Sequence, residues 1–324
     1  MGSEVRAQGQ CPDFVAIGFA CRDLVDQTYV LGGGVVYASL AACNLGLSVG
    51  IVTSLGPDLD LAAVLPGIEI VARPSPASTV FRNVYVDKAR TQYLYSRAGT
   101  LSADDVPPGW REASVVLLSP LAQEVPYNLG QLFPHALVGA NVQGWLRIWD
   151  ETRRVWPLPW PAGPGAMVGA QVLIAGESDL AAEPRGVAAL VESLPKRPGL
   201  DPPSKGACDL PSGEHAPGPG GVVVLTQGER GCTVYWEGRS RSFPAYPAVE
   251  VDPTGAGDTF AAAFLIEFRR SGDLAQAADF ANCVASFVVE RPGVEGVPTL
   301  VQVESRLGRA VSPWRSQGFG EHRT

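Results

Sequence analysis

Six short apolar runs recur along the chain and constrain its fold more than any other feature. They cover residues 14–20, 49–56, 115–120, 136–142, 171–176 and 221–226. Runs this continuous are typical of strands buried on both faces, as in a parallel sheet. Helix-like stretches lie between several of them, at 34–46, 127–133 and 185–194. The alternation predicts a doubly wound α/β fold with a mostly parallel central sheet.

Other segments depart from this rhythm. Residues 78–98 alternate with period two, which predicts a half-exposed hairpin, and with the preceding residues we expect a small antiparallel β lid at about 68–98. Residues 195–220 are rich in Pro, Gly and Ser and predict a long mobile surface loop. A hairpin over 231–243, turning at Glu237-Gly238, and two helices over 256–272 and 274–291 complete a single predicted domain over 1–324.

Composition excludes several classes of partner. The net charge of -8 gives no electrostatic reason to expect nucleic acid or an anionic membrane as partner, so a small-molecule ligand fits better. No apolar run approaches the ~18 residues of a membrane span, and the N-terminus resembles no signal peptide. The six cysteines include no C-x-x-C pair. We therefore expect a reduced, cytoplasmic protein without a disulfide framework or a structural zinc site.

The stretch "VDPTGAGDTF" at 251–260 carries the clearest chemistry, because it lies directly before a predicted helix. Gly255 and Gly257 flank Ala256, so their N–H groups can approach an anion at the positive end of that helix. Asp258 falls in the first helical turn, where it can accept a proton from a group that attacks a bound phosphate. The alternative is a tight turn in which Asp258 only complements the helix dipole.

"DPTGAGDTF" resembles the C-terminal signature of the ribokinase-like (PfkB) family of sugar and nucleoside kinases. The resemblance implies a three-layer α/β/α fold with a small β lid. It also implies ATP and Mg²⁺ as cofactors, K⁺ as a further candidate, and Asp258 as the catalytic base beside the amides of Gly255, Ala256 and Gly257.

The resemblance extends to the substrate side. Gly32, Gly33 and Gly34 form a glycine cluster before the first long helix, and Asp23, which we place at the end of the first strand, matches the family's substrate-binding aspartate. A carboxylate can accept two hydroxyl hydrogen bonds from one polyol. Tyr37 stands where many sugar kinases of the family have Asn. Only about ten residues separate Asp23 from Gly33, too few for the lid hairpin that ribokinases insert there.

A further candidate pair lies at 139–150, where the family commonly has D-P-x-x-R. Asn141 stands near the Asp position, and Arg147 is a candidate basic partner for phosphate or substrate. An ordinary loop with a solvated arginine is the alternative.

Nucleotide-side candidates follow from the same resemblance. Thr226, Gly228 and Gly231 are similar to the family's T-x-G-x-x-G, and Asn282 and Gly293 resemble the border of the adenine pocket.

The expected magnesium motif N-x-x-E is altered, because Gly176 replaces the Asn and Asp179 replaces the Glu. Asp179, with Glu177 as neighbour, keeps the charge that a hard cation requires. Asp252 is a candidate for the monovalent cation.

Together these features predict an ATP-dependent carbohydrate kinase that phosphorylates a hydroxyl of a sugar or cyclic polyol. A Tyr after three glycines and a Q-G-W-L-R stretch resemble the inositol-kinase-like branch. A nucleoside kinase of the same family and a catalytically silent binding or regulatory protein remain alternatives. A Rossmann dehydrogenase is excluded, because no G-x-G-x-x-G follows the first strand. Either a monomer or a homodimer is compatible with the sequence.

Overall fold

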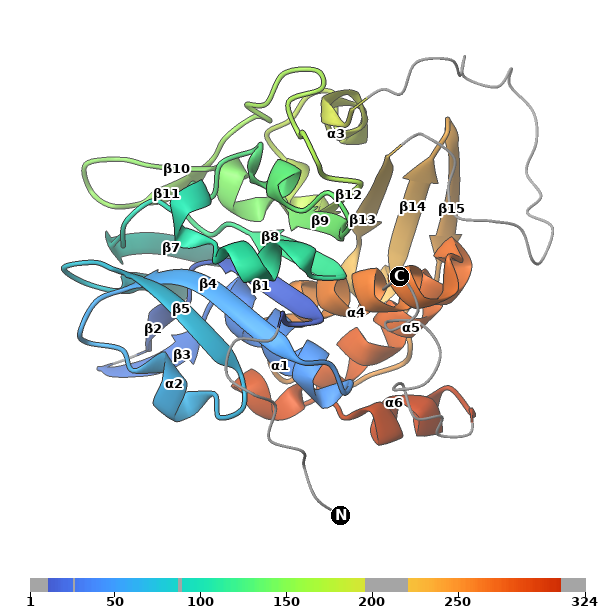
Figure 1. The fold of residues 1–324 in the computed structure, drawn as a ribbon, viewed down its shortest axis with the longest axis horizontal. Coiled ribbons are helices and arrows are strands. Elements are labelled where there is room, and N and C mark those ends of the chain that lie inside the picture. Colours follow the sequence, from blue (N-terminus) through green and yellow to red (C-terminus); the bar gives the residue numbers. More distant parts are fainter. Residues whose placement is uncertain (1–10, 26, 87–88, 196–220, 310–324) are drawn as a thin grey trace.

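The computed structural model describes residues 11–25, 27–86, 89–195 and 221–309. Its main element is a nine-stranded sheet with the order β15-β14-β13-β12-β9-β8-β1-β4-β5 (Figure 1). These strands are β1 (Phe14–Gly18), β4 (Val49–Leu55), β5 (Glu69–Pro74), β8 (Val115–Ser119), β9 (Leu137–Asn141), β12 (Val172–Gly176), β13 (Val222–Thr226), β14 (Cys232–Trp236) and β15 (Arg239–Phe243). Neighbours from β5 to β13 pair in parallel, whereas the pairs β13–β14 and β14–β15 are antiparallel. The predicted mostly parallel sheet is confirmed.

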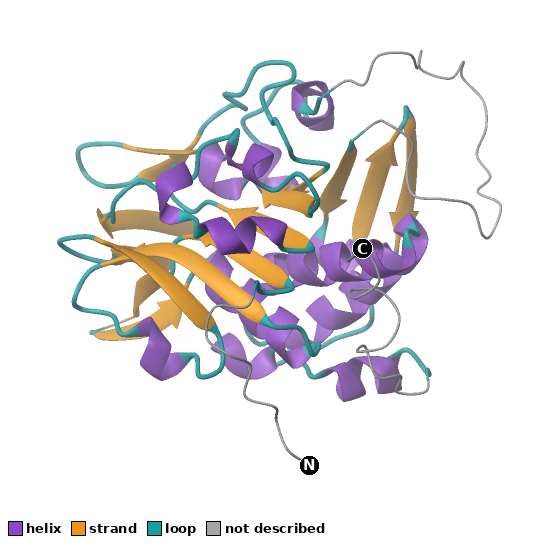
Figure 2. Cartoon of the chain, in the orientation of Figure 1, coloured by secondary structure: helices purple, strands orange, loops and turns teal. Residues whose placement is uncertain are grey.

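The six apolar runs form six of the parallel strands. These strands are apolar throughout because both faces of the sheet are covered. Along β1, Ala16 belongs to one hydrophobic cluster, whereas its neighbours Val15 and Ile17 belong to the cluster on the opposite face. Helices and short helical turns lie on both sides of the strands in Figure 2. Successive side chains point to opposite faces of the sheet, and both faces are buried. The runs therefore lack the polar residue at every second position that a half-exposed strand would have.

The first face is covered by α1 (Gly34–Asn44), α4 (Ala256–Ser271) and α5 (Leu274–Val288), with α6 (Leu300–Arg306) outside them. Helix α4 is buried along ten consecutive residues, Thr259–Phe268, because it lies between the sheet and the neighbouring helices. Small side chains in this helix allow the close approach, and Phe260 and Phe264 stack at 6.1 Å on one of its faces.

The second face carries shorter elements. It is covered by α3 (Val187–Ser193) and by 3₁₀ turns, while α2 (Leu61–Val64) lies beside β5. The 3₁₀ turns of the described chain are Ala103–Asp105, Pro108–Glu112, Leu129–Leu132, Gln143–Leu146, Glu177–Leu180, Gly228–Arg230 and Gly293–Gly296. The helix expected at 127–133 is wrong, since only the turn Leu129–Leu132 forms there. Gly130 lowers helix propensity within this segment, and Pro134 cannot continue a helix.

A second sheet, which we call the lid, has the strand order β3-β2-β6-β7. Its strands are β2 (Cys21–Val25), β3 (Thr28–Gly32), β6 (Thr79–Val86) and β7 (Ala89–Ser96). The predicted hairpin over 78–98 is confirmed as β6–β7. The lid is not wholly antiparallel, however, because β2 and β6 pair in parallel.

The lid differs from the sequence expectation in two further ways. Strands β2 and β3 pair antiparallel as a lid hairpin, with Val25 opposite Thr28. The expectation that the spacing between Asp23 and Gly33 is too short for such a hairpin was therefore wrong. The expected lower bound of 68 was also wrong, because Glu69–Pro74 pairs with β4 in the central sheet.

Two other hairpins lie at the edge of the main sheet and beside the lid. The predicted turn at Glu237-Gly238 is confirmed, with positive φ angles of 45° and 72° that suit the tight connection of β14 to β15. A short hairpin of β10 (Arg147–Trp149) and β11 (Val155–Pro157) lies against β7. Within the described residues, no helix combines the length and the apolar character that a membrane crossing requires. The loop expected at 195–220 lies, except for its first residue, outside the described residues.

Candidate active site

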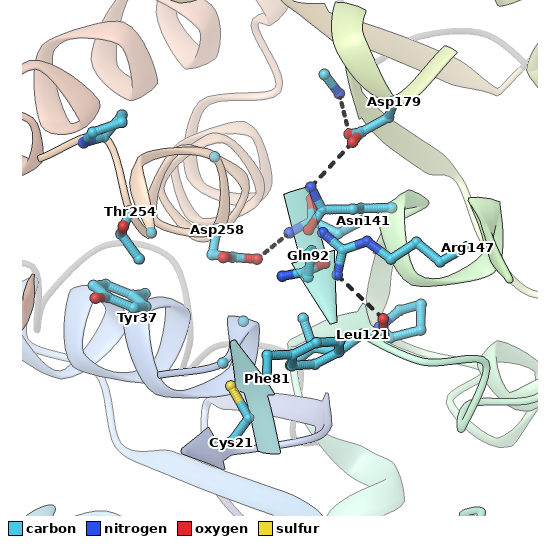
Figure 3. A pocket seen from close by; sticks show the side chains of 18 of the residues that line it. Cys21, Tyr37, Phe81, Gln92, Leu121, Asn141, Arg147, Asp179, Thr254 and Asp258 are labelled. Atoms are coloured by element: carbon cyan, nitrogen blue, oxygen red, sulfur yellow. Dashed lines mark hydrogen bonds between the residues drawn. The ribbon is translucent and has the colours of Figure 1, made fainter. Parts of the chain in front are cut away.

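A cavity of about 340 Å³ lies where the carboxyl ends of the parallel strands meet the lid (Figure 3). Parallel strands of an open α/β sheet place their carboxyl ends at one edge, which is where such folds bind ligands. The lining residues come from the lid, from strand ends and from the N-termini of α1 and α4. They include Asp23, Gly33, Gly34, Tyr37, Phe81, Gln92, Asn141, Gln143, Arg147, Gly176, Asp179, Thr226, Gly255, Gly257 and Asp258.

The glycine turn before α4 has the conformation that its sequence suggested. Gly255 is left-handed, with φ 79°, and a Cβ there would lie 2.1 Å from the ring of Tyr37. Only glycine satisfies both conditions without strain. Gly255 and Gly257 line the cavity, whereas Ala256 does not, and its N–H donates to the carbonyl of Pro253 at 3.3 Å. The positive end of a 16-residue helix therefore faces the cavity.

Asp258 lies at the centre of the site (Figure 3). Its Oδ1 accepts hydrogen bonds from Asn141 Nδ2 at 2.8 Å and from Ser119 Oγ at 3.4 Å. Burial raises the pKa of the Asp258 carboxyl to about 6, and these hydrogen bonds and the charge of Arg147 oppose the rise. A carboxyl with this pKa is mostly ionised at neutral pH and is a stronger base than an ordinary aspartate.

The glycine cluster before α1 creates the space that Asp23 and Asp258 occupy. A Cβ on Gly32 would lie 2.3 Å from Asp23 Oδ2, and a Cβ on Gly34 would lie 2.6 Å from Asp258 Oδ1. Gly33 has φ 107° and approaches the backbone of the segment after β1. Gly33 and Gly34 line the cavity, while Gly32 lies behind Asp23.

The acceptor-side candidates converge from three elements. Asp23 lines the cavity from β2 of the lid rather than from the end of the first strand, so that part of the expectation was wrong. Tyr37 is 2% exposed, and its phenol pKa is raised by burial and by the nearby charges of Asp252 and Asp23, so it remains protonated. Arg147 reaches across the cavity toward Asp258 in Figure 3, and its Nη1 donates to the carbonyl of Leu121 at 3.3 Å.

The structure separates the three candidate metal ligands. Asp179 lines the cavity, and its carboxylate accepts from Gly176 N at 2.9 Å and from Gln143 Nε2 at 3.0 Å. Glu177 instead pairs with Arg230 on the surface, which lowers its pKa. Asp252 accepts the amides of Thr254 and Gly293, each at 3.0 Å, and does not line the cavity.

Among the nucleotide-side candidates, Thr226 alone lines this cavity. Gly228 and Gly231 have φ 59° and 89° and shape the turn between β13 and β14. Asn282 is 5% exposed, and its Nδ2 donates to the carbonyls of Phe243 and Pro244 at 3.3 and 3.1 Å. Gly293, with φ 54°, donates its amide to Asp252. Their binding roles remain predictions.

The sequence analysis named Asn141 as a candidate but not as a partner of Asp258, and it did not name Ser119. Ser119 and Asn141 are the last residues of β8 and β9, and both point at the carboxylate. The sequence does contain a signal for them. Each is a polar residue at the end of a buried apolar run, and the carboxyl ends of parallel strands meet at one edge of the sheet. Gln92 and Gln143 were also missed, because no local pattern distinguishes a cavity-lining amide from a solvated one.

Comparisons with known proteins bear on the family and on the fold of the chain. Residues 210–300 match the family model described as pfkB family carbohydrate kinase. A nucleoside kinase of Methanothermobacter thermautotrophicus is 44% identical over 75 residues, which cover 23% of this chain and 24% of that protein. An inositol 3-kinase of Zea mays is 39% identical over 72 residues, which cover 22% of this chain and 19% of that protein. The matches thus span about a quarter of these relatives' length or less.

Solved structures match over a much larger part of the chain. A pyrophosphate-dependent myo-inositol-1 kinase, converted by mutation into a myo-inositol-3 kinase, has a TM-score of 0.69 and 19% identity, covering 90% of this chain and 99% of that chain. Arabidopsis thaliana ribokinase, complexed with ribose and ATP, has a TM-score of 0.65 and 18% identity, covering 93% of this chain and 100% of that chain. The chain therefore matches the pfkB family carbohydrate kinase model over residues 210–300 and shares the fold of the ribokinase-family structures.

Proposed function

We propose that the protein is an ATP-dependent kinase that transfers the γ-phosphate to a hydroxyl of a sugar or cyclic polyol. One observation carries this proposal: Asp258, with a pKa of about 6, lies at the N-terminus of α4 beside a glycine turn, in a cavity shared with Asp23 and Thr226. The proposal assigns these groups as the base, the anion-binding helix end and the polyol-binding carboxylate around one cavity.

In this mechanism Asp258 accepts the proton of the acceptor hydroxyl as its oxygen attacks the γ-phosphate. Asn141 and Ser119 donate to Oδ1, which holds the carboxylate in position and leaves Oδ2 for the hydroxyl. The amides at the start of α4 stabilise the negative charge on the transferring group. Closure of the lid over the acceptor excludes water as a competing nucleophile.

The residues present fit a magnesium ion. Mg²⁺ binds substrate phosphates through one or two carboxylates and several waters, and Asp179 supplies a carboxylate on the cavity wall. When bound, the ion would neutralise charge between the β- and γ-phosphates. Glu177 is a poorer candidate for a magnesium ligand, because it pairs with Arg230 on the surface. K⁺ near Asp252 remains a prediction, which rates measured in K⁺ and in Na⁺ test directly.

Several findings support the acceptor class. Asp23 can accept two hydroxyl hydrogen bonds, and inositol 3-kinases of Zea mays and Oryza sativa are among the relatives that match part of the chain. Nucleoside kinases of two archaea also match, so a nucleoside acceptor is the second candidate.

The deciding experiment couples nucleotide consumption to a panel of acceptors: myo-inositol, ribose, fructose, 2-keto-3-deoxygluconate and nucleosides. The proposal predicts turnover with a sugar or polyol that disappears in Asp258→Asn. Pyrophosphate is tested beside ATP, because three of the similar solved structures are of pyrophosphate-dependent kinases. Ligand binding without turnover for every donor and acceptor would instead support a silent binding protein.

A further inference from the structure

A second cavity of about 340 Å³ adjoins the first on the side of the β10–β11 hairpin. The two cavities share the lining residues Gln92, Gln143, Arg147, Ser178 and Asp179, so they are adjacent, with these side chains between them. The proposed mechanism uses the first cavity only. The second cavity is therefore adjacent, across Arg147, to the proposed position of the reacting hydroxyl.

The second cavity differs from the first in charge. Asp23, Asp179 and Asp258 outnumber Arg147 among the charged side chains that line the first cavity. In the second, Arg147 and Arg154 outnumber Asp179, whose carboxylate already accepts hydrogen bonds from the Gly176 amide and the Gln143 side chain. Judged by its charged side chains, the second cavity is thus the more favourable of the two for an anionic group on the acceptor.

Arg154 is held in place by the hairpin that carries it. Its guanidinium lies 4.0 Å from the ring centroid of Trp156, and the indole Nε1 donates to Asp150 at 2.7 Å. The backbone of the hairpin is joined to the lid, since Leu94 N donates to the Arg153 carbonyl at 2.8 Å and Tyr93 bridges to Arg154. Because the guanidinium already stacks on the indole, Arg154 has less rotamer freedom to lose when it binds an anion.

We propose that the second cavity is a subsite for an anionic group, phosphate or carboxylate, on the acceptor, with Arg154 as the residue that selects it. The inference rests on the proposed function, because it takes the first cavity as the site of the reacting hydroxyl. Thr91 and Gln92 add a hydroxyl and an amide to the wall, and such groups complete the hydrogen bonding of a bound oxyanion.

The test compares matched acceptors that differ by one anionic group. Ribose with ribose 5-phosphate and myo-inositol with myo-inositol 1-phosphate report on phosphate, and glucose with gluconate reports on carboxylate. We expect the anionic member of at least one pair to have the higher kcat/KM. In Arg154→Gln the ratio of anionic to neutral kcat/KM falls at least tenfold, equivalent to about 1.4 kcal/mol. Arg154→Lys, which keeps the charge, recovers part of the ratio.

Arg153 provides the matched control. It is the neighbouring arginine on the same hairpin, but it is exposed, lies over the ring of Tyr95 and lines neither cavity. Arg153→Gln should leave the ratio of anionic to neutral kcat/KM unchanged. An equal loss in the two glutamine variants would indicate a general electrostatic effect and would overturn the subsite.

Calorimetric binding of the same acceptors, measured without a phosphate donor, separates this inference from the proposed function. If no acceptor is phosphorylated but an anionic acceptor still binds more weakly to Arg154→Gln, the kinase proposal fails and the subsite stands. Tighter binding of the neutral members would overturn the subsite. Arg154→Gln could instead raise the KM for ATP and leave the KM for the acceptor unchanged. That result would mean that Arg154 binds the phosphate donor, and it would overturn the subsite as well.

Discussion

The two ends of the proposed active site are built in different ways. The donor end is mostly backbone: a glycine turn and the first amides of α4, with Thr226 at the end of β13. The acceptor end is made of side chains from separate elements, with Asp23 on β2, Gln92 on β7 and Arg147 on β10. Asp258 belongs to both ends, since it follows the glycine turn and faces the acceptor side.

This difference explains what each end can recognise. Backbone amides at a helix N-terminus bind phosphate oxygens whatever the side chains are, so one short turn can serve many kinases. Side chains on a lid and a hairpin can change without altering the central sheet. Selectivity for the acceptor is therefore expected to lie in the lid and in β10–β11, and the predictions below probe each end separately.

The largest effect is expected where the two ends meet. Asp258→Asn keeps the shape of the side chain but removes the proton acceptor, and general bases contribute about 10²–10⁴-fold to rate. We expect kcat to fall by this factor while nucleotide binding, measured by thermal shift, is retained. A variant that keeps more than about a third of wild-type turnover would show that Asp258 is not the base.

The next effect is confined to the acceptor end. Asp23→Asn replaces a charged acceptor of hydroxyl hydrogen bonds by an amide, and hydrogen bonds to charged groups contribute about 1.5–3 kcal/mol. We expect the KM for the acceptor to rise about 10- to 100-fold. The KM for ATP is the internal control and should change little. A parallel rise in both constants would mean that Asp23 supports the lid rather than the acceptor.

A stability comparison tests the backbone-built end. Gly255→Ala places a Cβ at φ 79° and within 2.1 Å of the Tyr37 ring, so we expect a loss of about 1–3 kcal/mol in the free energy of unfolding. Gly257→Ala adds a Cβ in open space within the helix, which should be neutral or stabilising by about 0.4–1 kcal/mol. Denaturant unfolding measures both, and equal changes would contradict the stated role of Gly255.

The sequence predicts the central sheet and the donor turn well because their signals are local. An apolar run identifies a doubly buried strand, and "TGAGD" identifies a tight turn before a helix within five residues. The lid hairpin at 21–32 was missed since its strands are short and half-exposed, and spacing alone did not exclude a minimal turn.

The remaining site residues depend on tertiary contacts. Asn141 and Ser119 are 117 and 139 positions from Asp258, and only the parallel arrangement of β8 and β9 brings them to its carboxylate. Asn282 shows the converse. The resemblance implies a place beside the nucleotide, which stays a prediction, and the structure adds that its amide donates to the carbonyls of Phe243 and Pro244.

The smallest effect is a shift in pH dependence. Because the pKa of Asp258 is raised to about 6, the carboxyl is protonated below that pH and cannot accept a proton from the hydroxyl. We therefore expect kcat/KM to rise with pH up to about 6 and then to level off. A profile that is flat down to pH 5 would contradict the burial-raised pKa.

Variants of the hydrogen-bond donors refine this profile. The bonds from Asn141 and Ser119 stabilise the ionised carboxylate and lower its pKa, so removing either one should move the midpoint to higher pH. Asn141→Ala removes the 2.8 Å bond and should shift the midpoint further than Ser119→Ala, which removes the 3.4 Å bond. The midpoint of log kcat/KM against pH measures both shifts. A downward shift would mean that the cavity fills with water once the donor is lost, so that solvation of the carboxylate outweighs the missing bond.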